Sequence, residues 1–136
     1  GLFHNKAKNI VKTARIVHED LNDVVPTDRK GIMALPGAGR KTANVVLSDI
    51  FGQETFAVDT HVSAISKRLH FVDQSASPLQ VENKIVGVLE PAELHQAHHT
   101  MIEYGRKYSM KLPPDREVCQ LIMDCDKLNE ENEAVI

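Results

Sequence analysis

The sequence is poor in the residues that stabilise small secreted proteins and membrane proteins. Only two of its 136 residues are cysteine, so at most one disulfide can form and a disulfide-stapled scaffold is excluded. No apolar run approaches the roughly 18 residues that span a bilayer, and the first residues do not look like a secretory signal. Tryptophan is absent, and four Phe and two Tyr leave the core aliphatic. We therefore expect an intracellular chain with no membrane partner.

Charge is divided unevenly along the chain, whose net charge is −3. The last 22 residues, Asp115 to Ile136, hold seven acidic and two basic side chains, whereas residues 1–114 hold fourteen basic and twelve acidic ones. Salt limits the reach of each charge to about 10 Å. A weakly basic body can therefore still bind a polyanion through a local patch.

Apolar residues recur at helical spacing along almost the whole chain, and no strand pattern stands out. The sequence therefore predicts an all-α fold with about seven short helices. We expect a single helical domain region over residues 1–136, with a glycine-rich hairpin in roughly 1–70, a C-terminal helical part in roughly 71–128 and an acidic tail in 129–136.

Several helix starts can be predicted from capping residues. Thr27 is the expected cap of a short second helix, Asp59 or Thr60 caps a later one, and Ser77 precedes another. A final short helix is predicted over Cys119 to Leu128. The first helix is expected to present one apolar face, formed by Ile10, Val11, Ala14, Val17 and Leu21.

The most informative stretch is the glycine-rich turn LPGAGRKTAN, residues 35–44. Pro36 ends the preceding helix, and the glycines at 37 and 39 permit unusual backbone angles and a close approach by a ligand. The next helix begins with free N–H groups that favour a phosphate oxygen. This arrangement is typical of a helix-hairpin-helix, which grips a nucleic-acid backbone regardless of sequence. The alternative is an ordinary tight turn, but the flanking residues favour backbone binding.

Four segments together resemble the endonuclease III family, DNA glycosylases and lyases of the helix-hairpin-helix superfamily. They are LPGAGRKTANVV (35–46), FAVDTHV (56–62), the opening GLFHNKAKNI and HHTMIEYGRKY (98–108). The resemblance covers nearly the whole chain. It implies the helix-hairpin-helix DNA glycosylase fold, incomplete at the N-terminus because the family's first helices have no counterpart here.

The resemblance implies base-excision repair of oxidised pyrimidines or abasic sites in duplex DNA. Lys41 would be the nucleophile and Asp59 its carboxylate partner, acting through a lysine Schiff base and β-elimination. The family's DNA-binding positions fall on Leu35, Pro36, Gly37, Ala38, Gly39, Arg40 and His61. It also implies a cytoplasmic location, at the nucleoid if the source is bacterial.

The chemistry of the residues agrees with these roles. A lysine amine must lose its proton before it attacks carbon, and the positive end of a helix, the neighbouring Arg40 and burial near Ala38 would all favour neutral Lys41. An ionised Asp59 would stabilise a developing sugar cation. Each residue also has a plainer interpretation. Lys41 would be a solvated surface charge, Asp59 an N-cap and His61 a locally hydrogen-bonded side chain.

The family commonly carries four cysteines that hold a [4Fe–4S] cluster, and this chain keeps only two of the positions. Cys119 and Cys125 match the last two, whereas the others fall on Arg116 and Ser109, which offer no thiolate. We therefore expect no cluster and no other cofactor. The two cysteines are then free thiols, an incidental metal pair or small buried side chains.

Other polar clusters are weaker candidates. His95 and His99 lie four residues apart, but no third ligand follows at a telling spacing, so no metal site is expected. Pairs of basic residues at 67–68 and 106–107, with Lys111, are candidate phosphate contacts beside Arg40. The surface left open by the missing helices would favour self-association.

The sequence is also consistent with two other functions. The chain could be a non-catalytic helix-hairpin-helix fragment that binds DNA without turning it over. It could instead be a helical fragment for protein–protein interaction, which would not show salt-dependent binding to duplex DNA.

Overall fold

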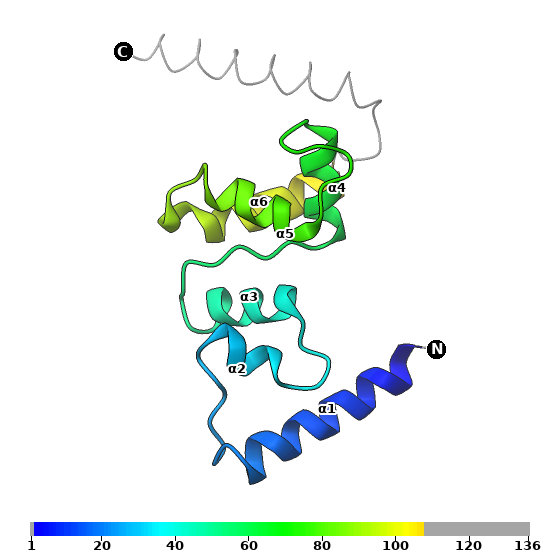
Figure 1. Cartoon of the computed structure of the whole chain (residues 1–136), viewed down its shortest axis with the longest axis vertical. Helices are drawn as coiled ribbons and strands as arrows, with labels where there is room; N and C mark the ends of the chain where they lie inside the picture. The colour runs from blue at the N-terminus through cyan, green and yellow to red at the C-terminus, as the bar shows by residue number, and fades with distance from the viewer. Residues whose placement is uncertain (1, 108–136) are drawn as a thin grey trace. The chain divides into compact units, whose positions relative to one another are not determined.

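The computed structural model describes residues 2–107, and in this part the chain is helical with no β-strand (Figure 1). The predicted all-α fold is thereby confirmed. The described elements are α1 (Leu2–Glu19), α2 (Arg29–Met33), α3 (Arg40–Asp49), α4 (Thr60–Arg68), α5 (Pro78–Val86), the 3-10 helix η1 (Pro91–Glu93) and α6 (Leu94–Lys107). No helix among the described residues is both long enough and apolar enough to cross a membrane. The predicted helix at Cys119 to Leu128 lies outside these residues.

The chain divides into two compact units. The first contains residues 2–57 and 88–96, and therefore α1, α2, α3 and η1. The second contains residues 58–87 and the described residues from 97 onward, and therefore α4, α5 and most of α6.

The core of the first unit lies between α2 and α3. Ile32, Ala43 and Leu47 are buried there, with Ala38, Val46 and Phe51 packed against them. The helical spacing of the α3 residues places them on one face. Helix α3 is thus held by its apolar side, which leaves its first turn at the surface.

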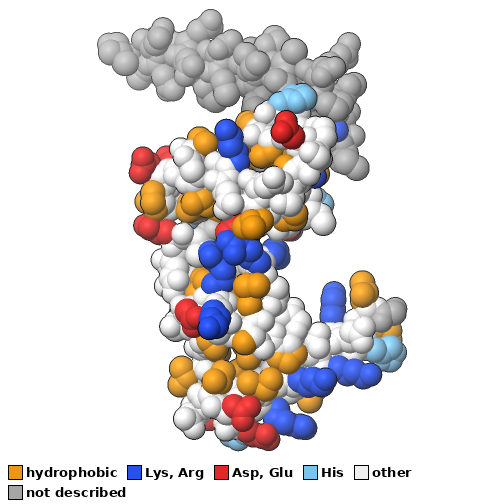
Figure 2. Space-filling model, viewed as in Figure 1, with side chains coloured by type: hydrophobic (Ala, Val, Ile, Leu, Met, Phe, Trp, Pro, Cys, Tyr) orange, Lys and Arg blue, Asp and Glu red, His pale blue; other side chains and the backbone are white. Residues whose placement is uncertain are grey.

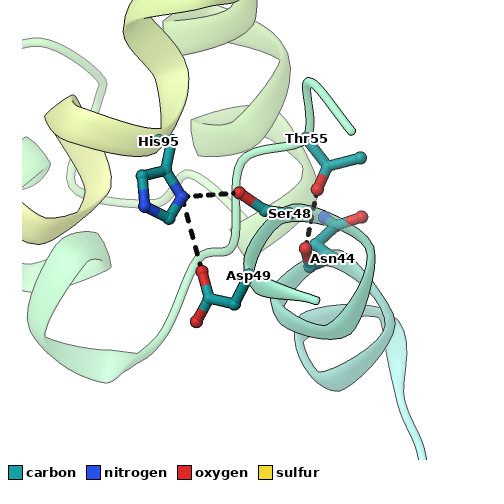
Figure 3. Close-up of polar contacts among 5 residues, drawn as sticks. All are labelled: Asn44, Ser48, Asp49, Thr55 and His95. Carbon is teal, nitrogen blue, oxygen red and sulfur yellow. Dashed lines mark hydrogen bonds and ion pairs between the residues drawn. The ribbon is translucent and has the colours of Figure 1, made fainter. Parts of the chain in front are cut away.

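A buried amide extends this core toward the segment that follows α3. Asn44 is completely buried, and its Nδ2 donates to the Phe56 carbonyl at 2.9 Å while its Oδ1 accepts from Arg29 Nε at 2.9 Å. Its backbone carbonyl accepts from Thr55 Oγ1 at 2.6 Å (Figure 3). Both ends of the amide are therefore satisfied, as a buried polar group requires.

The apolar face predicted for α1 is largely uncovered. Helix α1 has no buried residue, and Phe3, Ile10 and Val11 are 66%, 69% and 58% exposed. Lys and Arg side chains also gather along this helix (Figure 2). Of the predicted face, Ile10, Val11 and Ala14 are exposed and only Val17 and Leu21 are half-buried, so periodicity did not identify the side of α1 that is covered.

Two helix starts in the second unit match the sequence predictions. Asp59 caps α4, with its Oδ1 accepting the Val62 N–H at 2.7 Å. Ser77 and Gln80 form a reciprocal capping box at the start of α5.

The helices of the second unit pack closely. Gly105 of α6 lies so close to α4 that an added Cβ would be 2.6 Å from Ile65 Cδ1. The buried apolar side chains of this unit include Val58, Val62, Ile65, Val81 and Ile85.

The predicted cap of α2 was wrong by one residue. Asp28, not Thr27, is the N-cap, and its Oδ2 accepts the Gly31 N–H at 3.2 Å. Both residue types are good caps, but a carboxylate also interacts favourably with the positive end of the helix.

Candidate functional site

The glycine-rich turn between α2 and α3 has the signature of a type II β-turn. Pro36 and Gly37 occupy the two corners, and the Ala38 N–H donates to the Leu35 carbonyl at 3.1 Å, which closes the turn. Gly37 has φ +77°, in the region that a type II turn demands of its second corner residue. Glycine at this position is therefore required by the backbone itself.

The second glycine of the turn has a different reason to be there. Gly39 is the N-cap of α3 with an extended backbone (φ −87°, ψ −176°), which any residue can adopt. A Cβ added to it would meet nothing within 4 Å. The fold therefore does not demand glycine at 39, but its missing side chain leaves the start of α3 open to approach.

The first turn of α3 is uncapped by any side chain. The Gly39 carbonyl accepts the Ala43 N–H at 2.9 Å, so the N–H groups before it have no partner within the helix. This turn also carries the cationic residues Arg40 and Lys41. N–H groups that the helix itself does not pair, the helix dipole and two cations together form a surface suited to an anion such as a phosphate.

Lys41 is exposed, contrary to the burial expected near Ala38. The reason is the phase of the helix, because Ala43, Asn44 and Leu47 form the buried face of α3 and Lys41 lies off it. Burial therefore does not contribute to the reactivity of this amine in the described structure. The open helix start and the neighbouring Arg40 remain as its local surroundings.

Asp59 and His61 belong to the second unit, whereas Lys41 and the glycine turn belong to the first. Asp59 is half-buried, and its one described side-chain hydrogen bond is the cap to Val62. The plainer interpretation of Asp59 as an N-cap is therefore confirmed, and a catalytic role is compatible with it because a carboxylate has a second oxygen. His61 is exposed near the start of α4. The pairing of Lys41 with Asp59 stays a prediction.

The other cationic candidates are scattered over the second unit. Lys67 and Arg68 form the last turn of α4 and are half-buried, and Arg106 is exposed on α6. Lys111, Cys119 and Cys125 lie outside the described residues.

Sequence reasoning missed a polar cluster where α3 ends. His95 Nδ1 lies 2.9 Å from Ser48 Oγ and 3.4 Å from Asp49 Oδ1, and Figure 3 shows the ring directed at both side chains. Both contacts use the same ring nitrogen, whereas a Ser–His–Asp triad needs one nitrogen for each partner. The two contacts therefore connect the start of α6 to the end of α3, and their arrangement is not that of a Ser–His–Asp triad. Ser48 and Asp49 gave no signal in the sequence, because their partner His95 comes from far along the chain.

Comparisons with known proteins match most of the chain. Residues 1–91 match the family described as HhH-GPD superfamily base excision DNA repair protein. Endonuclease III of Escherichia coli K12 is 49% identical over 107 residues, which is 78% of this chain and 50% of that protein. Endonuclease III of Bacillus subtilis is 42% identical over 125 residues, or 92% and 57%. That of Rickettsia conorii is 40% identical over 126 residues, or 93% and 60%.

Solved structures give the same answer for the fold. A trapped covalent intermediate between endonuclease III and DNA, an estranged-adenine complex, matches with a TM-score of 0.79 and 45% identity, covering 83% of this chain and 54% of that one. A non-covalent endonuclease III–DNA complex matches equally well and is covered to 53%. The chain thus spans between half and three-fifths of the length of the curated relatives given above.

Proposed function

Because this chain belongs to the HhH-GPD superfamily of base excision DNA repair proteins, with endonucleases III as its relatives, we propose that it is a DNA glycosylase and abasic-site lyase. Its substrate would be duplex DNA that carries an oxidised pyrimidine or an abasic site. One of the similar structures is a trapped covalent intermediate with DNA, which supports a covalent mechanism.

The observation that carries this proposal is the open start of α3. The structure leaves its N–H groups without a side-chain cap, beside a glycine that the fold itself does not need. A DNA phosphate would occupy this place, with Arg40 supplying further positive charge. The contact would fix the position of the strand without reading its sequence.

Lys41 follows directly in the same turn and would be the nucleophile. Its neutral amine would add to C1′ of the sugar, and a damaged base would leave with the electron pair of the glycosidic bond and accept a proton. Opening of the sugar ring would give a Schiff base between Nζ and C1′. Loss of a proton from C2′ would then expel the 3′ phosphate, and water would release the lysine.

Asp59 would act as an ionised carboxylate at the start of α4. One oxygen caps the helix, and this bond holds the side chain in a fixed orientation. The negative charge would stabilise the cationic sugar that forms as the base leaves, and it would assist the proton transfers.

Reduction with borohydride in the presence of abasic-site duplex DNA tests this mechanism. We expect a covalent protein–DNA adduct with the wild-type chain, because borohydride reduces the Schiff base to a stable amine. Lys41→Gln should abolish the adduct. Lys30→Gln is a matched control, because Lys30 is an exposed lysine of the same unit on α2, and it should leave the adduct intact.

The exposure of Lys41 favours one alternative, a helix-hairpin-helix that binds DNA without catalysis. Salt-dependent binding to duplex DNA with no adduct from folded protein would establish that alternative. Absence of both binding and adduct would contradict the proposed function altogether.

We further propose that the chain carries no iron–sulfur cluster. A [4Fe–4S] cluster is held by four thiolates, and the chain has two cysteines in all. The donor set therefore does not fit this cofactor. Iron and sulfide analysis of purified protein should give neither element in stoichiometric amount, and lyase activity should survive treatment with an iron chelator.

The proposed function also implies where the chain acts. Its partner would be chromosomal duplex DNA, and in a bacterium the chain would then lie in the cytoplasm, at the nucleoid. Fluorescence microscopy of a tagged chain would show signal coincident with the DNA stain.

A further inference from the structure

Helix α1 contacts the glycine turn through two polar side chains. Thr13 Oγ1 donates a hydrogen bond to the Pro36 carbonyl at 3.3 Å. Asn9 lies against Gly37, where an added Cβ would be only 2.6 Å from Asn9 Nδ2. Residues four apart share one face of a helix, so α1 presents a single polar surface to the turn.

The Thr13 bond acts on the one peptide group that distinguishes turn types. Types I and II differ mainly in the orientation of the peptide between the two corner residues, here Pro36 and Gly37. The carbonyl of that peptide is the acceptor of the Thr13 hydroxyl. A flip to type I would turn this carbonyl away and break the bond. Thr13 therefore stabilises the observed orientation.

The same bond decides where the Gly37 N–H points. In a trans peptide the N–H and the carbonyl point in opposite directions, and the chain contains no cis peptide among its described residues. With the Pro36 carbonyl directed at Thr13, the Gly37 N–H faces away from α1. Asn9 occupies the space beside the Gly37 Cα and so limits movement of the corner.

We infer that Thr13 and Asn9 are positioning residues for DNA-backbone binding by the glycine turn. They act through the turn, by holding its central peptide so that the Gly37 N–H is presented to a phosphate oxygen. The inference rests on the proposed function, and it gives α1 a role although none of its residues is buried. Thr13 itself touches the turn and not the DNA.

Thr13→Val tests the inference because it removes the hydroxyl and keeps the branched shape. Thr13→Ser keeps the hydroxyl and serves as the rescue variant. Thr100→Val is the matched control, a Thr→Val change at an exposed position of α6. Each protein is titrated with a duplex that carries a stable tetrahydrofuran analogue of an abasic site. Exchange of the Ala38 amide hydrogen is followed by NMR without DNA.

We expect Thr13→Val to weaken duplex binding about two- to tenfold, the effect of one net hydrogen bond. The Ala38 amide, which closes the turn, should exchange faster by a similar factor. Thr13→Ser should restore both values, and Thr100→Val should change neither. The melting temperature of each variant shows that the fold is retained.

The outcomes separate the inference from the function on which it rests. A wild-type chain that does not bind the duplex contradicts the proposed function, and the role of the turn with it. If the wild type binds and Thr13→Val binds equally well, only the positioning role is overturned. Weaker binding with unchanged Ala38 exchange overturns it too, because Thr13 would then act by some route other than the turn.

Discussion

Helices α3 and α4 begin in opposite ways. Helix α4 starts at Asp59, whose carboxylate closes the first turn by accepting a backbone N–H, and α2 and α5 start in the same manner at Asp28 and Ser77. Helix α3 starts at Gly39 with no such bond. A cap contributes about 1 kcal/mol to stability, so the open start of α3 forgoes stability that the starts of α2, α4 and α5 have. That place is also where Arg40 and Lys41 gather.

Giving α3 a cap like that of α4 should produce the largest change. Gly39→Asp adds a carboxylate that competes with a phosphate for the same N–H groups and repels it. We expect duplex affinity to fall about tenfold to a hundredfold, while the free energy of unfolding stays equal or rises slightly. Fluorescence anisotropy and denaturant titration measure the two quantities.

Gly39→Ala is the control for this change. A Cβ fits at 39 without contact and brings no charge, so it should weaken binding less than the aspartate. Equal affinity of wild type and Gly39→Asp would show that the open helix start does not bind DNA.

Removing the cap of α4 should separate the two roles of Asp59. Asp59→Ala loses the bond to Val62 and should lower the free energy of unfolding by about 1 kcal/mol. Asp59→Asn can still cap and should change stability by only a few tenths of a kcal/mol. Both should slow strand cleavage at abasic sites, because both remove the negative charge. Full activity in Asp59→Asn would reduce this residue to its capping role.

The contribution of the cationic side chains at the start of α3 to DNA binding can be tested by varying the salt concentration. Duplex affinity should fall as salt rises, and Arg40→Gln should reduce the slope of log K against log salt by about 0.9 if Arg40 neutralises one phosphate. Glu54→Gln, a change of charge at an exposed residue of the same unit, should leave the slope nearly unchanged. An unaltered slope in Arg40→Gln would remove this residue from the interface.

The smallest effect is expected on the uncovered face of α1. Ile10→Lys should change the free energy of unfolding by no more than about 0.5 kcal/mol, because the side chain is 69% exposed. It should also reduce any self-association seen by analytical ultracentrifugation, since exposed apolar patches promote such contacts. A large loss of stability would mean that this face is covered in solution.

Features that depend on a few neighbouring residues could be predicted from the sequence. Asp59 and Ser77 cap helices because a side chain reaches its own backbone within three residues, and a short motif contains all the information. The choice of Asp28 over Thr27 depended on how the chain enters α2, which two adjacent capping residues cannot reveal. The glycine turn was likewise predicted between two helices, because Pro36 and the two glycines that form it lie within four residues of one another.

Features that depend on distant residues could not be predicted. The sequence showed Asn44 only as the end of the glycine-rich motif, and the approach of Phe56 and Arg29 makes it part of the core. The exposure of Lys41 followed from the phase of α3 against α2, which depends on packing. The contact of Thr13 with Pro36 joins residues 23 positions apart, beyond the reach of any motif.

The contact of Gly105 with Ile65 limits how the second unit can vary. A Cβ added at Gly105 on α6 would lie 2.6 Å from Ile65 Cδ1, the end of a buried side chain on α4, so a larger residue at 105 requires this side chain to shift. A methyl group at 105 would have to displace Ile65 or push α4 outward, and Asp59 would move with its helix. A substitution more than forty positions away along the chain would thus reorient the Asp59 carboxylate only to the extent that rotation of the Ile65 side chain fails to absorb the added methyl group.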